Sequence, residues 1–403
     1  MDFAPSAKAQ DFAQRLTAFM EEHVYPAEKV YHDQHVQHGD RWAVPPIIEE
    51  LKEKARSAGI WNLFLPDERF GAGLCVLEYA PLAEITGRCQ IAPEVFNCAA
   101  PDSGNMETLS LYGTPEQQAA WLPGLKTATQ GFAFGITEPD HGSDATHMET
   151  VATRDGDDWI INGVKTWNTG VHTAHSDMVM ARTSGSAGDA LGITAFLVPM
   201  DSPGVEVEEY LWTFNMPSDH ARVRFTNVRV PDAAIFAGAG RGLQVVQHFF
   251  NENRIRQAAS SLGAAQYCVN EAVEYAKHRK PFGKALATNQ AIQFPLVDLQ
   301  SRCEMLRALI HKTAWLMDRD GAFSVSDKVS MCNYQANQLC CEAADTAMQV
   351  HGGLGYSRYK PFEHIYRHHR RYRITEGADE IQKRRIAGYM FGFMNQQKPK
   401  GVS

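Results

Sequence analysis

The chain has 403 residues, of which 44% are hydrophobic and 21% are charged. These proportions are typical of a globular protein with a sizeable core, and they exclude a disordered or fibrous chain. The formal net charge of -8 argues against a general nucleic-acid-binding protein, although a local basic cluster can still bind an anionic ligand.

The eight cysteines show no Cys-x-x-Cys pairing, and most lie in apolar helical stretches, where small buried hydrophobic residues are common. This usage indicates a reducing compartment. The N-terminal segment matches neither a signal peptide nor an arginine-rich transit peptide, and no window approaches 18 uninterrupted apolar residues. We therefore expect a cytoplasmic protein without a membrane span.

The periodicity of apolar residues divides the chain into three parts. Residues 7 to about 125 show helical spacing, and Thr114-Pro115 is typical of a capped helix start. From about 131 to 232 the period approaches two, in short runs between turn clusters, which predicts a small antiparallel β domain. Long apolar stripes from Gly242 to about 393 predict a helical bundle. We expect an α+β fold, with an all-α domain (1–130), a β-barrel-like domain (131–241) and a four-helix bundle (242–403).

Two motifs in the predicted β domain carry groups suited to a planar ligand. Residues 137–144, Thr-Glu-Pro-Asp-His-Gly-Ser-Asp, follow a strand and offer hydroxyl and main-chain hydrogen-bond donors. Residues 165–170 place Trp167 two residues before Thr169. The aromatic ring can cover one face of a flavin while the hydroxyl binds its edge.

Three further motifs lie in the predicted bundle. Residues 279–284, with Gln290 after them, offer a phosphate-pairing arginine and an amide. Residues 349–356 contain glycines that let the main chain approach phosphate oxygens. Residues 374–382, Ile-Thr-Glu-Gly-Ala-Asp-Glu-Ile-Gln, contain Glu376.

In this order and at these separations, the five motifs resemble those of the acyl-CoA dehydrogenase family over nearly the whole chain. Residues 61–66, 100–107 and 376–380 most resemble a branch of the family whose larger animal members carry an added kinase-like domain. Members of this branch are associated with long-chain, branched or hydroxylated acyl-CoAs.

The resemblance implies a role for each matching residue. Glu376 matches the catalytic base. The positions that match FAD-binding residues are Phe134, Ile136, Thr137, Ser143, Trp167, Thr169, Arg279, Phe282, Gln290, Gln349, Gly352, Gly353, Ala378 and Glu380. The positions that match substrate-binding residues are Ser143, Asn251, Arg254 and Gly377. No metal is implied.

The implied reaction is α,β-dehydrogenation of an acyl-CoA thioester to the trans-2-enoyl-CoA, as in fatty acid β-oxidation. Glu376 would take the α-proton while the flavin N5 takes the β-hydride, and an electron-transfer flavoprotein would accept the electrons. Because a free glutamate titrates near about 4.3, burial must raise its pKa towards the working range. The Glu376 main-chain N–H and the FAD ribityl hydroxyl would stabilise the enolate oxygen. The resemblance also implies a homodimer or a homotetramer made of two dimers.

Two other functions remain open at this stage. One is a flavin-dependent oxidase of the same fold that reacts with oxygen. The other is a non-catalytic acyl-CoA or flavin binding protein, against which an intact Glu376 argues.

Several residues depart from the family pattern. Asn253 stands where some members carry an alternative base, and an amide takes no proton at neutral pH, which favours Glu376. Glu252 is one residue further back and would point elsewhere on a helix. Five further residues differ from those common in the family, and they make the match to the family weaker for the CoA contacts than for the flavin site. They are Asp140, His141, His147, Asn251 and Ala378.

Three polar clusters allow more than one interpretation. Asp102, Ser103 and Asn105 lie in a helix that, by the resemblance, borders the acyl cavity, and they either bind a polar group on the acyl chain or form a helix boundary. His32, His35 and His38 fit a solvated helix face better than a metal site. For residues 367–373, Arg-His-His-Arg-Arg-Tyr-Arg, surface packing or contact with CoA phosphates or a partner subunit is favoured over nucleic-acid binding.

Overall fold

The computed structural model describes residues 3–214 and 220–394. The chain forms two compact units: unit 1 comprises residues 1–28, 74–93 and 251–403, and unit 2 comprises residues 29–73 and 94–250. This division into two units does not test the three consecutive domain ranges expected from the sequence, which stay a prediction. Within the described residues, every helix is too short or too polar to cross a membrane.

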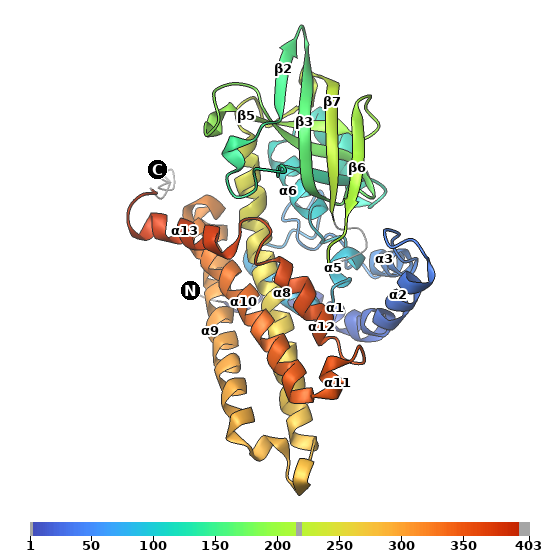
Figure 1. Ribbon diagram of the computed structural model, residues 1–403, viewed down its shortest axis with the longest axis vertical. Helices are drawn as coiled ribbons and strands as arrows, with labels where there is room; N and C mark the ends of the chain where they lie inside the picture. The colour runs from blue at the N-terminus through green and yellow to red at the C-terminus, as the bar shows by residue number, and fades with distance from the viewer. Residues whose placement is uncertain (1–2, 215–219, 395–403) are drawn as a thin grey trace. The chain divides into compact units, whose positions relative to one another are not determined.

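Unit 2 is built on one mixed sheet. Its strands run in the order β6-β7-β3-β2-β4-β5-β8, and β1 lies beside β4. The strands are β1 (Gly131–Gly135), β2 (Val151–Asp155), β3 (Asp158–Thr169), β4 (Ala174–Arg182), β5 (Ile193–Pro199), β6 (Val205–Leu211), β7 (His220–Pro231) and β8 (Ile235–Phe236). Figure 1 shows β2, β3, β7 and β6 as long neighbouring arrows.

The expectation of an antiparallel domain is confirmed for most strand pairs and wrong for β1. β1 pairs with β4 in parallel, and a single parallel bridge joins β2 to β4. Parallel neighbours need a long crossover, and the β2–β3 hairpin lies in the connection between β1 and β4. The local period of two predicts strands but carries no information about this pairing.

β7 alternates between buried and exposed residues on either side of a register shift at Thr226 and Asn227, and so buries one face of the sheet. Val223, Phe225, Val228 and Val230 are all buried and join a core cluster with Phe196 of β5. Burying each such side chain stabilises the fold by about 1.5–3 kcal/mol. The hydrophobic alternation therefore fixes which face of β7 is covered.

Among the described residues, the α-helices that lie wholly within unit 2 are α3 (Ile47–Ser57), α6 (Asp102–Tyr112) and α7 (Pro115–Lys126). The predicted cap of α7 is confirmed, because Thr114 Oγ1 accepts from Gln117 N at 3.2 Å and Gln117 Oε1 accepts from Thr114 N at 3.1 Å. Asp102 Oδ1 accepts from Phe132 N at 2.7 Å, and Asn105 Nδ2 donates to Phe132 O at 3.1 Å. The first and last of the three polar side chains at 102–105 thus tie α6 to β1.

Unit 1 is helical. Its helices are α1 (Ala7–Phe19), followed by a π-helical turn (Met20–Val24), α4 (Val76–Thr86), α9 (Gln290–Asp320), α10 (Ser326–His351), α11 (Gly353–Tyr356), α12 (Phe362–Arg371) and α13 (Asp379–Met390). Helices α2 (Tyr25–Gln37), α5 (Ala92–Val95) and α8 (Gly242–His278) have residues in both units. α10 packs against α9, α12 and α13, and Figure 1 shows α9 and α10 side by side in orange.

Glycine allows a close crossing within unit 1. A Cβ on Gly263 of α8 would lie 1.9 Å from the carbonyl oxygen of Glu84 in α4. No side chain fits at that distance, so Gly263 is required for α4 and α8 to meet. Nearby, Arg307 of α9 pairs with Glu84 at 2.8 Å.

The basic run 367–373 packs within unit 1. His368 and His369 are buried, and burial lowers the pKa of His369 to about 3. Arg367 pairs with Glu363 at 2.6 Å. These contacts support the packing interpretation of the run.

Candidate active site

Glu376 lies on a strained turn between α12 and α13. Its φ is +55°, and the following Gly377 has φ +96°. A left-handed conformation in a residue with a side chain costs on the order of 1–3 kcal/mol and is most frequent at functional sites. A Cβ on Gly377 would lie 3.2 Å from Ile381 Cγ2 and 3.3 Å from Arg254 Nη2, so only glycine fits there without strain.

Two side chains hold the main chain of this turn. Arg254, 2% exposed, donates from Nε to the Glu376 carbonyl oxygen at 3.1 Å, and its Nη2 donates to the same oxygen. Gln382 Nε2 donates to that oxygen at 3.2 Å and to Gly377 O at 2.8 Å. The structure therefore places Arg254 of α8, which the sequence predicts as substrate-binding, in contact with the turn that presents Glu376.

The Glu376 carboxyl group accepts two amide hydrogen bonds. Asn253 Nδ2 and Gln257 Nε2 donate to Oε1 at 3.2 and 3.0 Å. Burial raises the pKa of Glu376 from its ordinary value of 4.5 to about 7, although Arg254, Asn253, Arg371 and Gln257 act in the opposite direction. A carboxyl group that titrates near neutrality is matched to general-base catalysis at physiological pH.

The residues around Asn253 agree with the choice of Glu376 over other acids. Asn253 donates to Glu376 and so supports that carboxyl group. Glu252 forms an ion pair with Arg256 one turn further along α8, at 3.7 Å. The prediction that Glu252 points elsewhere is confirmed.

Asn251 is fully buried in unit 1, and within the described residues neither polar atom of its amide has a hydrogen-bond partner. Leaving a buried amide unpaired costs about 1–3 kcal/mol, so such groups commonly mark a place where a ligand completes the bonding. This fits its predicted substrate-binding role.

The flavin-matching residues of unit 2 lie on β1, β3 and the loop after β1. Phe134 and Ile136 are buried, Thr137 is half-buried, and Ser143 is exposed. Trp167 is 52% exposed, has φ +58° and sits where the β3–β7 register shifts. A bulge at this point turns the indole out of the sheet.

Thr169 and Trp167 share a neighbour that sequence reasoning missed. His220 Nδ1 lies 2.9 Å from Thr169 Oγ1, and the His220 and Trp167 rings meet edge to face at 5.8 Å. Because His220 opens β7 some 50 residues further on, only the strand pairing brings it to this position.

A buried ion pair fixes the strands beneath these residues. Lys165 Nζ donates to Glu138 Oε1 at 2.8 Å and to Ile136 O at 3.2 Å. Glu138 also accepts from the main-chain N–H groups of Glu149 and Thr150, at 2.5 and 2.9 Å. The pair thus connects β3 to the loop that carries Thr137 and Ser143.

The remaining cofactor-matching residues lie in unit 1 and face solvent. They are Arg279, Phe282, Gln290, Gln349, Gly352, Gly353 and Glu380, with Ala378 half-buried at the start of α13. The Phe282 ring is fully exposed, and the main chain of this residue has φ +55°. Apart from their chain neighbours, none of the residues that the structure describes comes within 4 Å of a Cβ built on Gly352 or Gly353.

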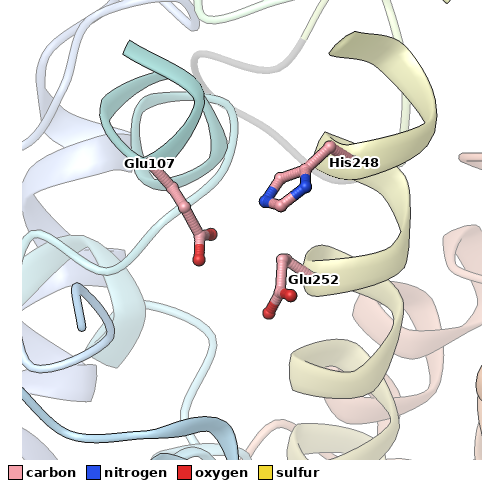
Figure 2. Close-up of side chains that lie close together, drawn as sticks. All are labelled: Glu107, His248 and Glu252. Atoms are coloured by element: carbon pink, nitrogen blue, oxygen red, sulfur yellow. The ribbon is translucent and has the colours of Figure 1, made fainter. Parts of the chain in front are cut away.

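Apart from the Lys165–Glu138 pair, unit 2 contains a further acidic side chain that lies close to a histidine. Figure 2 shows Glu107 of α6 pointing towards His248 of α8, and their possible ligand atoms lie within 4.8 Å of one another. His248 Nδ1 is 3.3 Å from the Tyr112 hydroxyl. Glu252 is one turn further along α8 (Figure 2), where Arg256 pairs with it. The sequence did not single out Glu107 or His248.

Three models of protein families match consecutive parts of the chain. They are the acyl-CoA dehydrogenase N-terminal domain over residues 6–129, the middle domain over 133–228 and the C-terminal domain over 240–391. The chain belongs to the acyl-CoA dehydrogenase family. It is thus an oxidoreductase with the family's N-terminal helical, middle β-sheet and C-terminal helical domains, as predicted.

Individual members of the acyl-CoA dehydrogenase family match nearly the whole chain. FadE2 of Mycobacterium tuberculosis, named a probable acyl-CoA dehydrogenase, is 40% identical over 96% of each protein. Acyl-CoA dehydrogenase family member 11 of Mus musculus is 37% identical over 96% of this chain and 50% of the relative. The chain therefore spans about half the length of that animal protein.

Solved structures of the acyl-CoA dehydrogenase family share the fold. Butyryl-CoA dehydrogenase from Megasphaera elsdenii is 28% identical, with a TM-score of 0.84 over 97% of this chain and 100% of that one. A glutaryl-CoA dehydrogenase from Mycobacterium smegmatis in complex with FADH2 is 24% identical, with a TM-score of 0.82 over 96% of this chain and 95% of that one.

Proposed function

We propose that the protein dehydrogenates an acyl-CoA thioester to the trans-2-enoyl-CoA, with Glu376 as the base and FAD as the cofactor. The carrying observation is the position of the Glu376 carboxyl group, which stands on a strained turn that Arg254 and Gln382 hold in place, where burial raises its pKa to about 7. An arrangement that stores strain and also tunes one carboxyl group is expected for catalysis rather than for structure.

The residues present fit FAD. Trp167 and Phe282, at two positions that match FAD-binding residues, expose aromatic rings that offer a flat apolar surface to a planar ligand. Gly352 and Gly353 leave open space where a side chain would stand, so the main chain there can approach a phosphate. When bound, FAD supplies the acceptor for the hydride from the β-carbon.

The protein's own residues act on the α-carbon. Because its pKa is about 7, half of the Glu376 carboxyl groups are ionised at pH 7 and most are ionised above that pH, and the ionised form can take the α-proton of a thioester. Arg254 fixes the carbonyl oxygen of Glu376, which limits the positions that the carboxyl group can adopt. Asn251 offers a buried amide for the CoA side of the substrate.

The proposal includes partners. Phe294, Val297 and Met305 expose an apolar stripe on α9, which supports the expected homodimer or tetramer. We propose an electron-transfer flavoprotein as the acceptor on the basis of family membership. All eight cysteines are free thiols, which supports the proposed cytoplasmic location.

A panel of acyl-CoAs tests the function. The purified holoprotein is mixed anaerobically with short, long, branched and hydroxylated acyl-CoAs while the flavin absorbance is followed. We expect at least one thioester to bleach the flavin. Peroxide on admission of air would identify an oxidase instead, and acyl-CoA binding without bleaching would indicate a non-catalytic binding protein. A purified protein that binds no added FAD would overturn the proposal.

A further inference from the structure

The two oxygens of the Glu376 carboxyl group have different surroundings. Oε1 accepts from Asn253 Nδ2 at 3.2 Å and from Gln257 Nε2 at 3.0 Å. Oε2 is buried and has no hydrogen-bond partner within residues 3–214 and 220–394. A carboxylate oxygen that already accepts two donors has little capacity left for a proton, so an incoming proton goes to the other oxygen.

The orientation of Gln257 follows from its neighbours. The main-chain carbonyl of Arg254 can only accept, so Asn333 of α10 must present its Nδ2 there, at 3.3 Å. The same Nδ2 lies 3.2 Å from the Gln257 side chain, which must therefore turn its Oε1 to Asn333. This leaves Gln257 Nε2 facing Glu376. Asn333 and Gln257 are almost fully buried, so water does not compete for these bonds.

We propose that Gln257 is a positioning residue for proton abstraction: together with Asn253 it holds Oε1 of Glu376 as a hydrogen-bond acceptor, so that Oε2 takes the α-proton. The α C–H bond breaks, an O–H bond forms at Oε2, and the electron pair moves into the thioester as an enolate. This inference rests on the proposed function.

The charges that face Glu376 act with the two amides. Arg254 of α8 and Arg371 of α12 favour the ionised carboxylate, and Arg385 of α13 adds positive charge next to Arg254. Burial acts in the opposite direction and is the largest influence on the pKa. Because both amides donate to the ionised form, loss of either one raises the pKa of Glu376 further.

The pH dependence of kcat/KM tests the role of Gln257, because it reports the base of the free enzyme. We expect the acidic limb of the wild-type holoenzyme near pH 7. Replacing Gln257 with the similarly sized Met removes a charge-assisted hydrogen bond, which shifts that limb upward by about one pH unit. At pH 6 the variant should be about tenfold less active, and the two profiles should converge at high pH.

Two further variants complete the kinetic experiment. Asn253→Leu removes the other donor and should shift the limb in the same direction, which keeps the test usable if Gln257→Met does not fold. Gln266→Met makes the same substitution on α8 at a residue that binds Asn270 and Gln300, so its profile should match that of the wild type.

Folding provides a readout that does not depend on catalysis. The difference in unfolding free energy between Gln257→Met and Gln257→Met/Glu376→Gln, measured against pH, reports the titration of Glu376. The upper of the two midpoints of this pH dependence reports the pKa of Glu376 in the folded protein. It should lie about one pH unit above the corresponding midpoint for the wild-type/Glu376→Gln pair.

The outcomes separate the two proposals. If the wild type bleaches with an acyl-CoA but Gln257→Met has an unchanged profile and an unchanged folding midpoint, the role of Gln257 is refuted and the function stands. If no acyl-CoA bleaches the wild type, the function fails, and with it the role of Gln257 in proton abstraction.

Discussion

Replacing Lys165 with Met removes one partner of the buried ion pair in unit 2. Lys165 is fully buried and Glu138 almost so. Removing one partner of such a pair costs about 3–5 kcal/mol, because the remaining charge stays in a site of low polarity. Glu138 keeps two main-chain donors, from Glu149 and Thr150. We therefore expect the unfolding free energy of Lys165→Met to fall by an amount at the lower end of this range, about 3 kcal/mol.

Urea unfolding of the holoprotein, followed by tryptophan fluorescence, measures this loss. The double variant Lys165→Met/Glu138→Gln removes both charges. Its loss of unfolding free energy should therefore be about 2 kcal/mol smaller than the sum of the losses of the two single variants. A loss below about 1 kcal/mol for Lys165→Met, or additivity within about 0.5 kcal/mol, would refute the coupling of the pair.

Three other measurements follow from the structure. Between pH 4.5 and 7 the unfolded chain loses the Glu376 proton that the folded chain keeps, so the contribution of Glu376 to the stability of the wild type falls as the pH rises. Relative to the wild type, Glu376→Gln should gain nothing below pH 4.5 and at most about 3 kcal/mol above pH 8 in urea unfolding. Gly377→Ala should lose about 1–3 kcal/mol in the same assay, because φ is +96° and the new Cβ meets atoms at 3.2 and 3.3 Å; an unchanged stability would contradict this geometry. In the native protein at most Cys75 and Cys98 should react with a thiol reagent such as dithionitrobenzoate, since the other six cysteines are buried, and reaction of all eight without unfolding would show that the interior is open.

Local patterns in the sequence predict the parts of the fold that local forces determine. The capping box at Thr114 satisfies helix-end groups through residues three apart, and the alternation in β7 puts one face of a strand in the core. The cap appears in the structure as expected, and the alternation appears on either side of a break at Thr226 and Asn227, which are both exposed. The parallel pairing of β1 with β4 depends on a connection of many residues, and no local period encodes it.

The candidate site shows the same division. Glu376 could be found because it lies in a recognisable motif, but its amide partners lie more than 100 residues away in the chain. Asn253, Gln257 and Ser261 recur every four residues and so form a polar row along α8, which is the signal that could have drawn attention to Gln257. Tertiary packing then decides whether such a polar residue serves the core or the site.

The central claim is that Glu376 removes the α-proton. Anaerobic stopped-flow reduction of the flavin by an active acyl-CoA, for the wild type and for Glu376→Gln, tests it most directly. We predict that the variant keeps its flavin and its acyl-CoA affinity while the rate of bleaching falls by about 10²–10⁴-fold. Bleaching within about tenfold of the wild-type rate would contradict the claim and place the base on another residue.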